Sequence, residues 1–131
     1  MKFATAAISL FASAAAVYAA ALARREVGSG THFDVAVGYT ACGTLHSNDQ
    51  FLVAASAPLY DSTAIDGNPN NNQICGRQIS ISGPAGGPVI ATVVDRCPVC
   101  AQNDMDMTPS LFQAVVGDLG IGRAEISWNW V

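Results

Sequence analysis

Positively charged side chains are scarce in this 131-residue chain, which has six lysine and arginine residues against ten acidic ones. Lys2 is the single lysine, and Arg24-Arg25 is the single adjacent basic pair. Without residues 1–25, three arginines would face ten acidic side chains, and the net charge would fall from −4 to −7. Nucleic acids and anionic membranes are bound through clusters of Lys and Arg. The sequence therefore argues against both partners and favours a neutral polymer or a cationic one.

The chain also lacks patterns that accompany a covalent nucleophile or a redox site. No Ser or Cys sits in a glycine-rich elbow. No alternation of strands and helices surrounds the Cys97-x-x-Cys100 motif, which argues against a thioredoxin-like site. The motif has zinc-ligand spacing, but Cys42 and Cys75 do not form a second close pair, so zinc is only the competing interpretation. We predict no metal and no cofactor.

The first residues have the three parts of a secretory signal. Lys2 gives the positive start, residues 3–17 the apolar run, and Val17-Tyr18-Ala19 a small-residue cleavage site. We predict a signal peptide over residues 1–20, a propeptide over 21–25 that ends in Arg-Arg, and one domain over 26–131. The alternative is an uncleaved membrane anchor with a positive flank. Cleavage would give a secreted, extracellular or cell-wall protein, which we expect to be a monomer.

Four cysteines, an even number in a small exported domain, predict two disulfides. The cysteines are Cys42, Cys75, Cys97 and Cys100. A β-hairpin centred on Ala85 would place Cys75 opposite residue 95, which favours a Cys75–Cys97 bond and leaves Cys42 for Cys100. A register slip of two residues would undo this choice, so the three connectivities stay open.

Short apolar or alternating runs separated by glycine- and proline-rich corners make up the rest of the chain. We expect strands over residues 31–37, 51–55, 77–82, 89–94 and 123–131, helical turns over 56–60 and 108–116, and a surface loop over 61–73. In the last strand Trp128 is expected in the core, whereas Trp130 is as well suited to stacking on a sugar ring. Such a pattern, without βαβ periodicity, is typical of a closed all-β barrel.

Several separated motifs resemble one group of proteins. They are Gly30-Thr31-His32-Phe33-Asp34, Ala41-Cys42-Gly43, His46-Ser47-Asn48-Asp49, Val53-Ala54-Ala55-Ser56, Cys75-Gly76-Arg77, Val93-Val94-Asp95-Arg96-Cys97 and Met105-Asp106-Met107-Thr108-Pro109. In this order they resemble the double-psi β-barrel proteins of the RlpA-like, expansin and barwin group, especially small fungal expansin-like proteins (loosenins), and also kiwellins. The resemblance implies a six-stranded double-psi β-barrel with one or two short helices.

The resemblance also implies a function. Expansin-like domains lay an open groove across the barrel and disrupt contacts between wall polysaccharides without hydrolysis. Their groove Asp falls on Asp106, a first-strand Thr on Thr31, and an Asp at the end of a hairpin strand on Asp95. The same barrel hosts several activities, so the fold alone does not fix the function.

The chemistry of the carboxylates also allows a catalytic interpretation. Asp106 and Asp95 are the candidate catalytic pair, with Asp104 beside them and Asp34 as a conceivable second base. The plainer interpretation makes Asp104 a turn charge and lets Asp95 pair with Arg77 or accept turn amides. An inward-facing Asp106 would need a hydrogen bond to offset its burial.

The candidate substrate-binding residues are Thr31, Tyr39, Asp95 and Asp106. Thr31 could hold the Asp106 carboxylate or a sugar hydroxyl, and Tyr39 could stack on a pyranose ring or pack on the barrel rim. We expect His32 and His46 to be surface or capping residues.

Two function classes follow. The first is a non-hydrolytic protein that binds wall glucan or chitin, for which no hydrolysis is expected although weak endoglucanase or lytic transglycosylase activity stays open. The second is a protein-binding module, such as a protease inhibitor or host-interacting effector, that uses the loop over residues 61–73.

Overall fold

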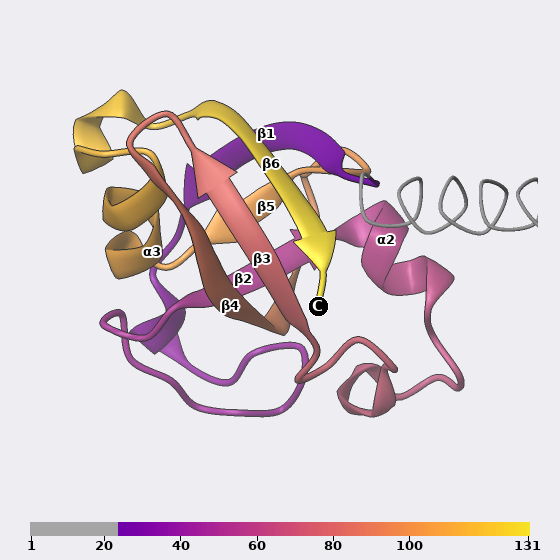
Figure 1. Cartoon of the computed structure of the whole chain (residues 1–131). Coiled ribbons are helices and arrows are strands. Elements are labelled where there is room, and N and C mark those ends of the chain that lie inside the picture. Colours follow the sequence, from indigo (N-terminus) through magenta and orange to yellow (C-terminus); the bar gives the residue numbers. More distant parts are fainter. Residues whose placement is uncertain (1–23) are drawn as a thin grey trace, which may run out of the picture.

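Six strands close into one barrel in the order β1-β5-β2-β4-β3-β6 (Figure 1). The computed structural model describes residues 24–131, so the predicted signal peptide and residues 21–23 of the predicted propeptide lie outside the described residues. The strands are β1 (Glu26–His32), β2 (Leu52–Ser56), β3 (Gln78–Gly83), β4 (Gly86–Cys97), β5 (Met105–Met107) and β6 (Ala124–Trp130). This arrangement confirms the six-stranded all-β barrel.

Two short helices and three 3₁₀ turns connect the strands. They are α2 (Ala57–Ser62), α3 (Pro109–Val115), η1 (Val35–Val37), η2 (Pro69–Asn71) and η3 (Leu119–Ile121). Figure 1 shows α2 and α3 on different sides of the barrel. The Ser56 hydroxyl accepts a hydrogen bond from the Leu59 amide at 3.2 Å, as expected of a helix cap. No helix within residues 24–131 has the length and apolar character needed to cross a membrane.

Strand pairing in the barrel is mixed. β1 runs parallel to β5 and β2 runs parallel to β4, whereas the other neighbouring strands are antiparallel. The β3–β4 hairpin pairs Ile79 with Ala91 and Ile81 with Val89, so it is centred on Ala85 as predicted. Residues far apart along the chain therefore meet on shared strand rows.

The barrel interior is filled by one apolar cluster. Alternate residues of β3, β5 and β6 point into it, and α3 covers it with Leu111 and Phe112. Trp128 is buried, with its indole N–H donating to the Asn103 carbonyl at 2.9 Å. This confirms the core assignment of Trp128. Trp130 is half-buried, and the Arg77 guanidinium lies 4.0 Å from its ring centroid.

The first strand is earlier than the sequence pattern predicts. The prediction placed it over residues 31–37, but β1 ends at His32 and residues 35–37 form η1. Asp34 starts that turn by accepting the Ala36 amide at 2.9 Å. Glycine hides the true strand pattern, because the Cα of Gly28 faces the Asn103 carbonyl so closely that a side chain would overlap it.

The disulfides are Cys42–Cys75 and Cys97–Cys100, so the favoured pairing of Cys75 with Cys97 is wrong. The hairpin register itself is right, but another segment enters beside it. The Cys42 amide donates to the Val94 carbonyl and the Gly76 amide to the Val93 carbonyl, which brings Cys42 next to Cys75. Meanwhile the end of β4 pairs with β2, where Cys97 lies opposite Ser56.

Candidate functional site

One row of side chains runs across four neighbouring strands, and we call it the Asp106 row. Thr31 of β1 pairs with Asp106 of β5, Asp106 pairs with Ala54 of β2, and Ala54 pairs with Asp95 of β4. Directly paired residues project from the same face of a sheet. Met105 and Met107 fill the barrel interior, so the row between them lies on the outer face. Asp106 therefore does not point into the barrel interior.

Thr31 and Asp106 are in direct contact. The Thr31 hydroxyl donates to the Asp106 carboxylate at 2.8 Å, which is one of the two roles predicted for Thr31. Burial raises the pKa of Asp106, while the Thr31 hydrogen bond and the nearby His32 oppose that rise and Asp95 adds to it. Asp106 is thus the carboxyl of the row that is best placed to keep a proton and donate it to a ligand oxygen.

Asp95 is fixed by backbone amides. Its Oδ1 accepts from the Ala41 amide at 2.8 Å and from the Arg96 amide at 2.9 Å. The sequence allowed Asp95 either to pair with Arg77 or to accept backbone amides. The structure shows the second, because the Arg77 guanidinium stacks on Trp130 instead. Asp95 therefore fastens the loop after η1 to the end of β4 and still leaves its second oxygen for a ligand.

The two candidate catalytic carboxylates stand two strands apart. Strand spacing places their backbones about 9–10 Å from each other. Retaining glycosidases hold their carboxyl groups much closer, and inverting enzymes need a water-activating base at a distance of roughly 6.5–9.5 Å. Since Asp95 is held by two amides, it is better suited to anchoring a loop and a ligand than to activating water.

Tyr39 lies on the loop that Asp95 fastens. It stands two residues before Ala41, and 77% of its surface is exposed. Of the two roles considered, packing on the rim would bury more of the ring than the structure does. The exposed ring is available for stacking on a flat apolar surface near the Asp95 end of the row.

The remaining polar candidates have structural partners. Asp104 accepts the Ser29 and Ala101 amides at 2.9 Å each, so it ties β1 to the turn before β5. Asp34 caps η1 and accepts from the Asn48 amide group. His32 lies 3.0 Å from the Leu119 carbonyl and packs edge-on against Phe112, whereas His46 contacts Thr44 and Gln50.

Sequence reasoning missed two contributors. Ala54 separates Asp106 from Asp95 along the row, and its side chain is buried between its neighbours. Arg96 makes a bidentate ion pair with Asp61, with N···O distances of 2.9 and 2.8 Å, which fastens the 61–73 loop to β4. A small residue within an apolar strand signals the first, but nothing local signals the second.

Replacing Asp106 by Asn should alter how stability depends on pH. Because the pKa of Asp106 is raised above 3.8, the folded protein holds this proton at pH values at which the unfolded chain has lost it. The native protein thus gains stability as pH falls through the raised pKa, and the gain is complete below about 3.8. Asn lacks that gain. Urea unfolding should therefore show that the free energy of unfolding of D106N, relative to that of the native protein, is higher at neutral pH than in acid.

Asp34→Asn is the matched control for that measurement. The Asn48 side chain and the Ala36 amide lower the pKa of Asp34, so its stabilising contribution is present at neutral pH and is lost as pH falls below 3.8. D34N should therefore be less stable than the native chain at neutral pH and equal to it in acid. Parallel pH profiles for the two variants would contradict the burial of Asp106.

Comparisons with known proteins place this geometry among related barrels. No family model matches the sequence. A homolog of the allergen Asp f 7 from Arthroderma benhamiae is 36% identical over 90 residues, which cover 68% of this chain and 28% of that protein. The papain inhibitor of Streptomyces mobaraensis is 33% identical over 97 residues, which cover 72% of this chain and 64% of that protein. The chain therefore spans less than two thirds of either relative.

Solved structures match over most of the barrel. The Streptomyces papain inhibitor superposes with a TM-score of 0.71 at 28% identity, covering 83% of this chain and 96% of the inhibitor. An Asp-to-Asn variant of the Clavibacter michiganensis expansin, in complex with cellohexaose, superposes with a TM-score of 0.67 at 26% identity. That match covers 82% of this chain and 50% of the expansin. The expected resemblance to expansin-like double-psi barrels is confirmed.

Proposed function

We propose that this chain, an expansin-like double-psi β-barrel protein, is a secreted monomer that binds a neutral wall polysaccharide along the Asp106 row without hydrolysing it. The observation that carries the proposal is the alignment of Thr31, Asp106, Ala54 and Asp95 on one outer face. A row of donors and acceptors that crosses four strands suits an extended polymer better than a small molecule. The cellohexaose complex of the related expansin supports the glucan class, and chitin is the second polymer to test.

The chemistry of the row favours binding over bond cleavage. The Asp106 carboxyl can form hydrogen bonds with sugar hydroxyls, and Thr31 holds the carboxyl in place. Hydrolysis would also need a base that activates water. Asp95 is committed to two backbone amides, and no other carboxylate belongs to the row. We therefore expect no new reducing ends when a glucan is incubated with the protein.

Asp106→Ala should reduce retention on insoluble cellulose or chitin by about tenfold or more, because the hydrogen bond between the Asp106 carboxyl and a sugar hydroxyl is lost. Thr31→Val should have a smaller effect in the same direction, since it keeps the shape and removes only the supporting hydroxyl. Bound and free protein are measured by sedimentation of the polymer over a range of protein concentrations.

Asp49→Ala is the control for these variants. It removes an exposed carboxylate from the loop between η1 and β2, and so makes the same charge change away from the row. If D49A and D106A lose retention equally, then overall charge and not the Asp106 row governs binding, and the proposal fails. Circular dichroism of all three variants checks that each remains folded.

Inhibition of a cysteine protease is the second candidate function. It is favoured by the match to 96% of the Streptomyces papain inhibitor and by exposed apolar side chains on several loops. These side chains are Val37, Leu45, Ile65 and Val99. Titration against papain with a chromogenic substrate separates the two functions. Stoichiometric inhibition without retention on any polysaccharide would replace the first proposal with the second.

A further inference from the structure

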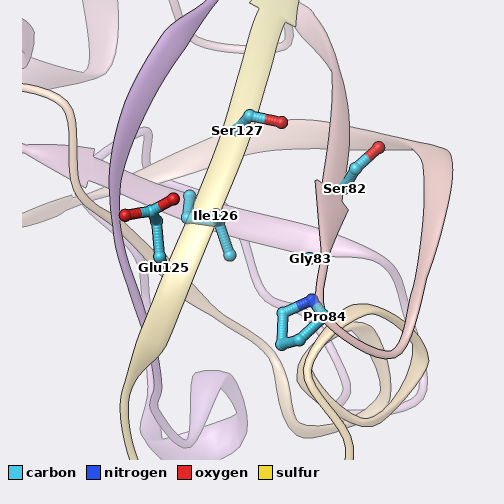
Figure 2. Close-up of a pocket in the computed structure, with 6 residues that line it drawn as sticks. All are labelled: Ser82, Gly83, Pro84, Glu125, Ile126 and Ser127. Carbon is cyan, nitrogen blue, oxygen red and sulfur yellow. The ribbon is translucent and has the colours of Figure 1, made fainter.

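The two strands that contribute nothing to the Asp106 row, β3 and β6, border a pocket of about 360 Å³. Its lining residues come from the end of β3, the turn that follows it and the first half of β6 (Figure 2). They are Ser82, Gly83, Pro84, Glu125, Ile126 and Ser127. We call it the Ser82/Ser127 pocket. Because the barrel is closed, it opens on a different part of the outer surface from the row.

The pocket exists because β3 leaves β6 early. Ser82 and Ser127 are the last directly paired residues of the two strands. After them Gly83 approaches the Val115 carbonyl of α3 so closely that a side chain would overlap it, and the Ala85 amide donates to the same carbonyl at 2.9 Å. The hairpin tip is thus held against α3. A gap is left beside residues 124–126 of β6.

The lining of this gap combines polar and apolar groups, and it is almost free of charge. Figure 2 shows the Ser127 side chain on the side of β6 that faces β3, the hydroxyl of its strand partner Ser82 directed away from β6, and Pro84 at the end of the gap. The Glu125 carboxylate lies on the other side of β6. A hydroxyl group both donates and accepts hydrogen bonds, and the proline ring offers an apolar contact of about the size of a sugar ring edge.

We propose that the Ser82/Ser127 pocket binds one neutral sugar unit of a polysaccharide. Sugar hydroxyls pair with the Ser127 hydroxyl in the gap and with the Ser82 hydroxyl at its outer edge, and the C–H face of the ring packs on Pro84. Anionic ligands are disfavoured, because no basic side chain lines the pocket. The neighbouring outward positions continue the uncharged polar surface along the two strands with Ser80 and its partner Asn129.

Two other occupants fit less well. The free edge of β6 beside the pocket is only residues 124–126, which is shorter than the five or six residues of a typical strand, so an added peptide strand would gain few hydrogen bonds. Within residues 24–131 no group of three or more His, Cys, Asp or Glu side chains is arranged to hold a metal ion. A neutral sugar uses the hydroxyls without needing either feature.

Two contact faces on one barrel would let a single molecule touch two polymer chains. This consequence rests on the proposed function, because it needs the Asp106 row to bind the same class of polymer. The pocket itself does not depend on the row. Ligand binding to the pocket is therefore tested separately from ligand binding to the Asp106 row.

Amide chemical shifts of the ¹⁵N-labelled protein, followed during titration with cellohexaose and with N-acetylglucosamine hexamer, test the proposal. We expect one of the two sugars to move the amide signals of Gly83 and residues 125–127. Absence of these shifts with both sugars overturns the proposal. Shifts at Thr31, Ala54 and Asp106 report on the row in the same spectra, so failure of one site is seen independently of the other.

The variant that tests the pocket combines Ser82→Ala with Ser127→Ala. This double variant should raise the dissociation constant, measured from the pocket amide shifts, by about tenfold, because two neutral hydrogen bonds are removed. The matched control combines Ser62→Ala with Ser110→Ala. Ser62 ends α2 and Ser110 lies in the first turn of α3, both away from the pocket, so this variant should leave the constant unchanged. An unchanged constant in the S82A/S127A variant overturns the proposal.

Glu125→Gln distinguishes a neutral ligand from a cationic one. For a neutral sugar this change should have little effect on the pocket shifts. If only a glucosamine hexamer binds and E125Q abolishes its binding, the ligand is cationic and the neutral-sugar assignment is wrong. A threonine- and valine-rich hexapeptide that shifts the same amides while both sugars do not would assign the gap to a peptide and likewise overturn the proposal.

Discussion

Replacing Cys42 and Cys75 by serine should lower the free energy of unfolding by about 4 kcal/mol, whereas replacing Cys97 and Cys100 should lower it by only about 2 kcal/mol. A disulfide restricts the unfolded chain more when it closes a longer loop. The first bond joins cysteines 33 residues apart and the second joins cysteines three apart. The loss is large against the 5–15 kcal/mol that is typical of a small domain.

Urea unfolding of the two double variants, followed by tryptophan fluorescence, measures both values. The C42S/C75S variant also releases the loop that Asp95 fastens through the Ala41 amide, so signals of that loop should broaden in a nuclear magnetic resonance spectrum. The C97S/C100S variant serves as the control for loss of a disulfide as such. Equal destabilisation by the two pairs would contradict the dependence on loop length.

Trp128→Ala should cost about 3–5 kcal/mol, which makes it the most damaging single substitution that we expect. Trp128 is the largest fully buried side chain, and its indole N–H donates to the Asn103 carbonyl. Removal would leave a cavity in the barrel and a carbonyl without its partner. Because Asn103 lies just before Asp104 and β5, the same change should loosen the strand that carries Asp106.

Trp130→Ala is the matched control. Its ring packs edge-to-face with Trp128 at a centroid distance of 5.4 Å, but it is only half-buried and lies under Arg77. Its loss should cost clearly less, and should leave retention on polysaccharide unchanged if Trp130 belongs to the barrel wall and not to a ligand site. Thermal unfolding of both variants gives the comparison, and a larger loss for W130A would reverse the two assignments.

Local patterns predicted the β3–β4 hairpin and the last strand well. The β3–β4 turn is marked by glycine and proline, and β6 alternates large apolar residues with polar ones. The first strand was missed because Gly28 and Gly30 occupy its inward positions, where a side chain would overlap neighbouring atoms. An apolar face cannot be read from residues that have no side chain. The apparent alternation over residues 33–37 belongs to packing outside the barrel, where Phe33 and Val35 meet Leu52 and Val94.

In the candidate site, too, local patterns predict less than contacts between distant residues determine. Thr31 and Asp106 were expected to be close, and the structure places them in contact, but that expectation came from a resemblance and not from their positions 75 residues apart. The disulfide pairing failed for a related reason. It depends on where residues 40–43 run, and only the Val94 and Asp95 contacts fix that path. Contacts between distant segments leave little trace in a local pattern.

Pairing of β1 with β6 has a consequence for how the protein acquires its structure. The first strand and the last strand are neighbours, so the barrel cannot close until residues 124–130 have joined it. A chain emerging from a ribosome thus holds an incomplete sheet with open edges until residues 124–130 have also emerged. Non-local pairing of this kind also slows folding.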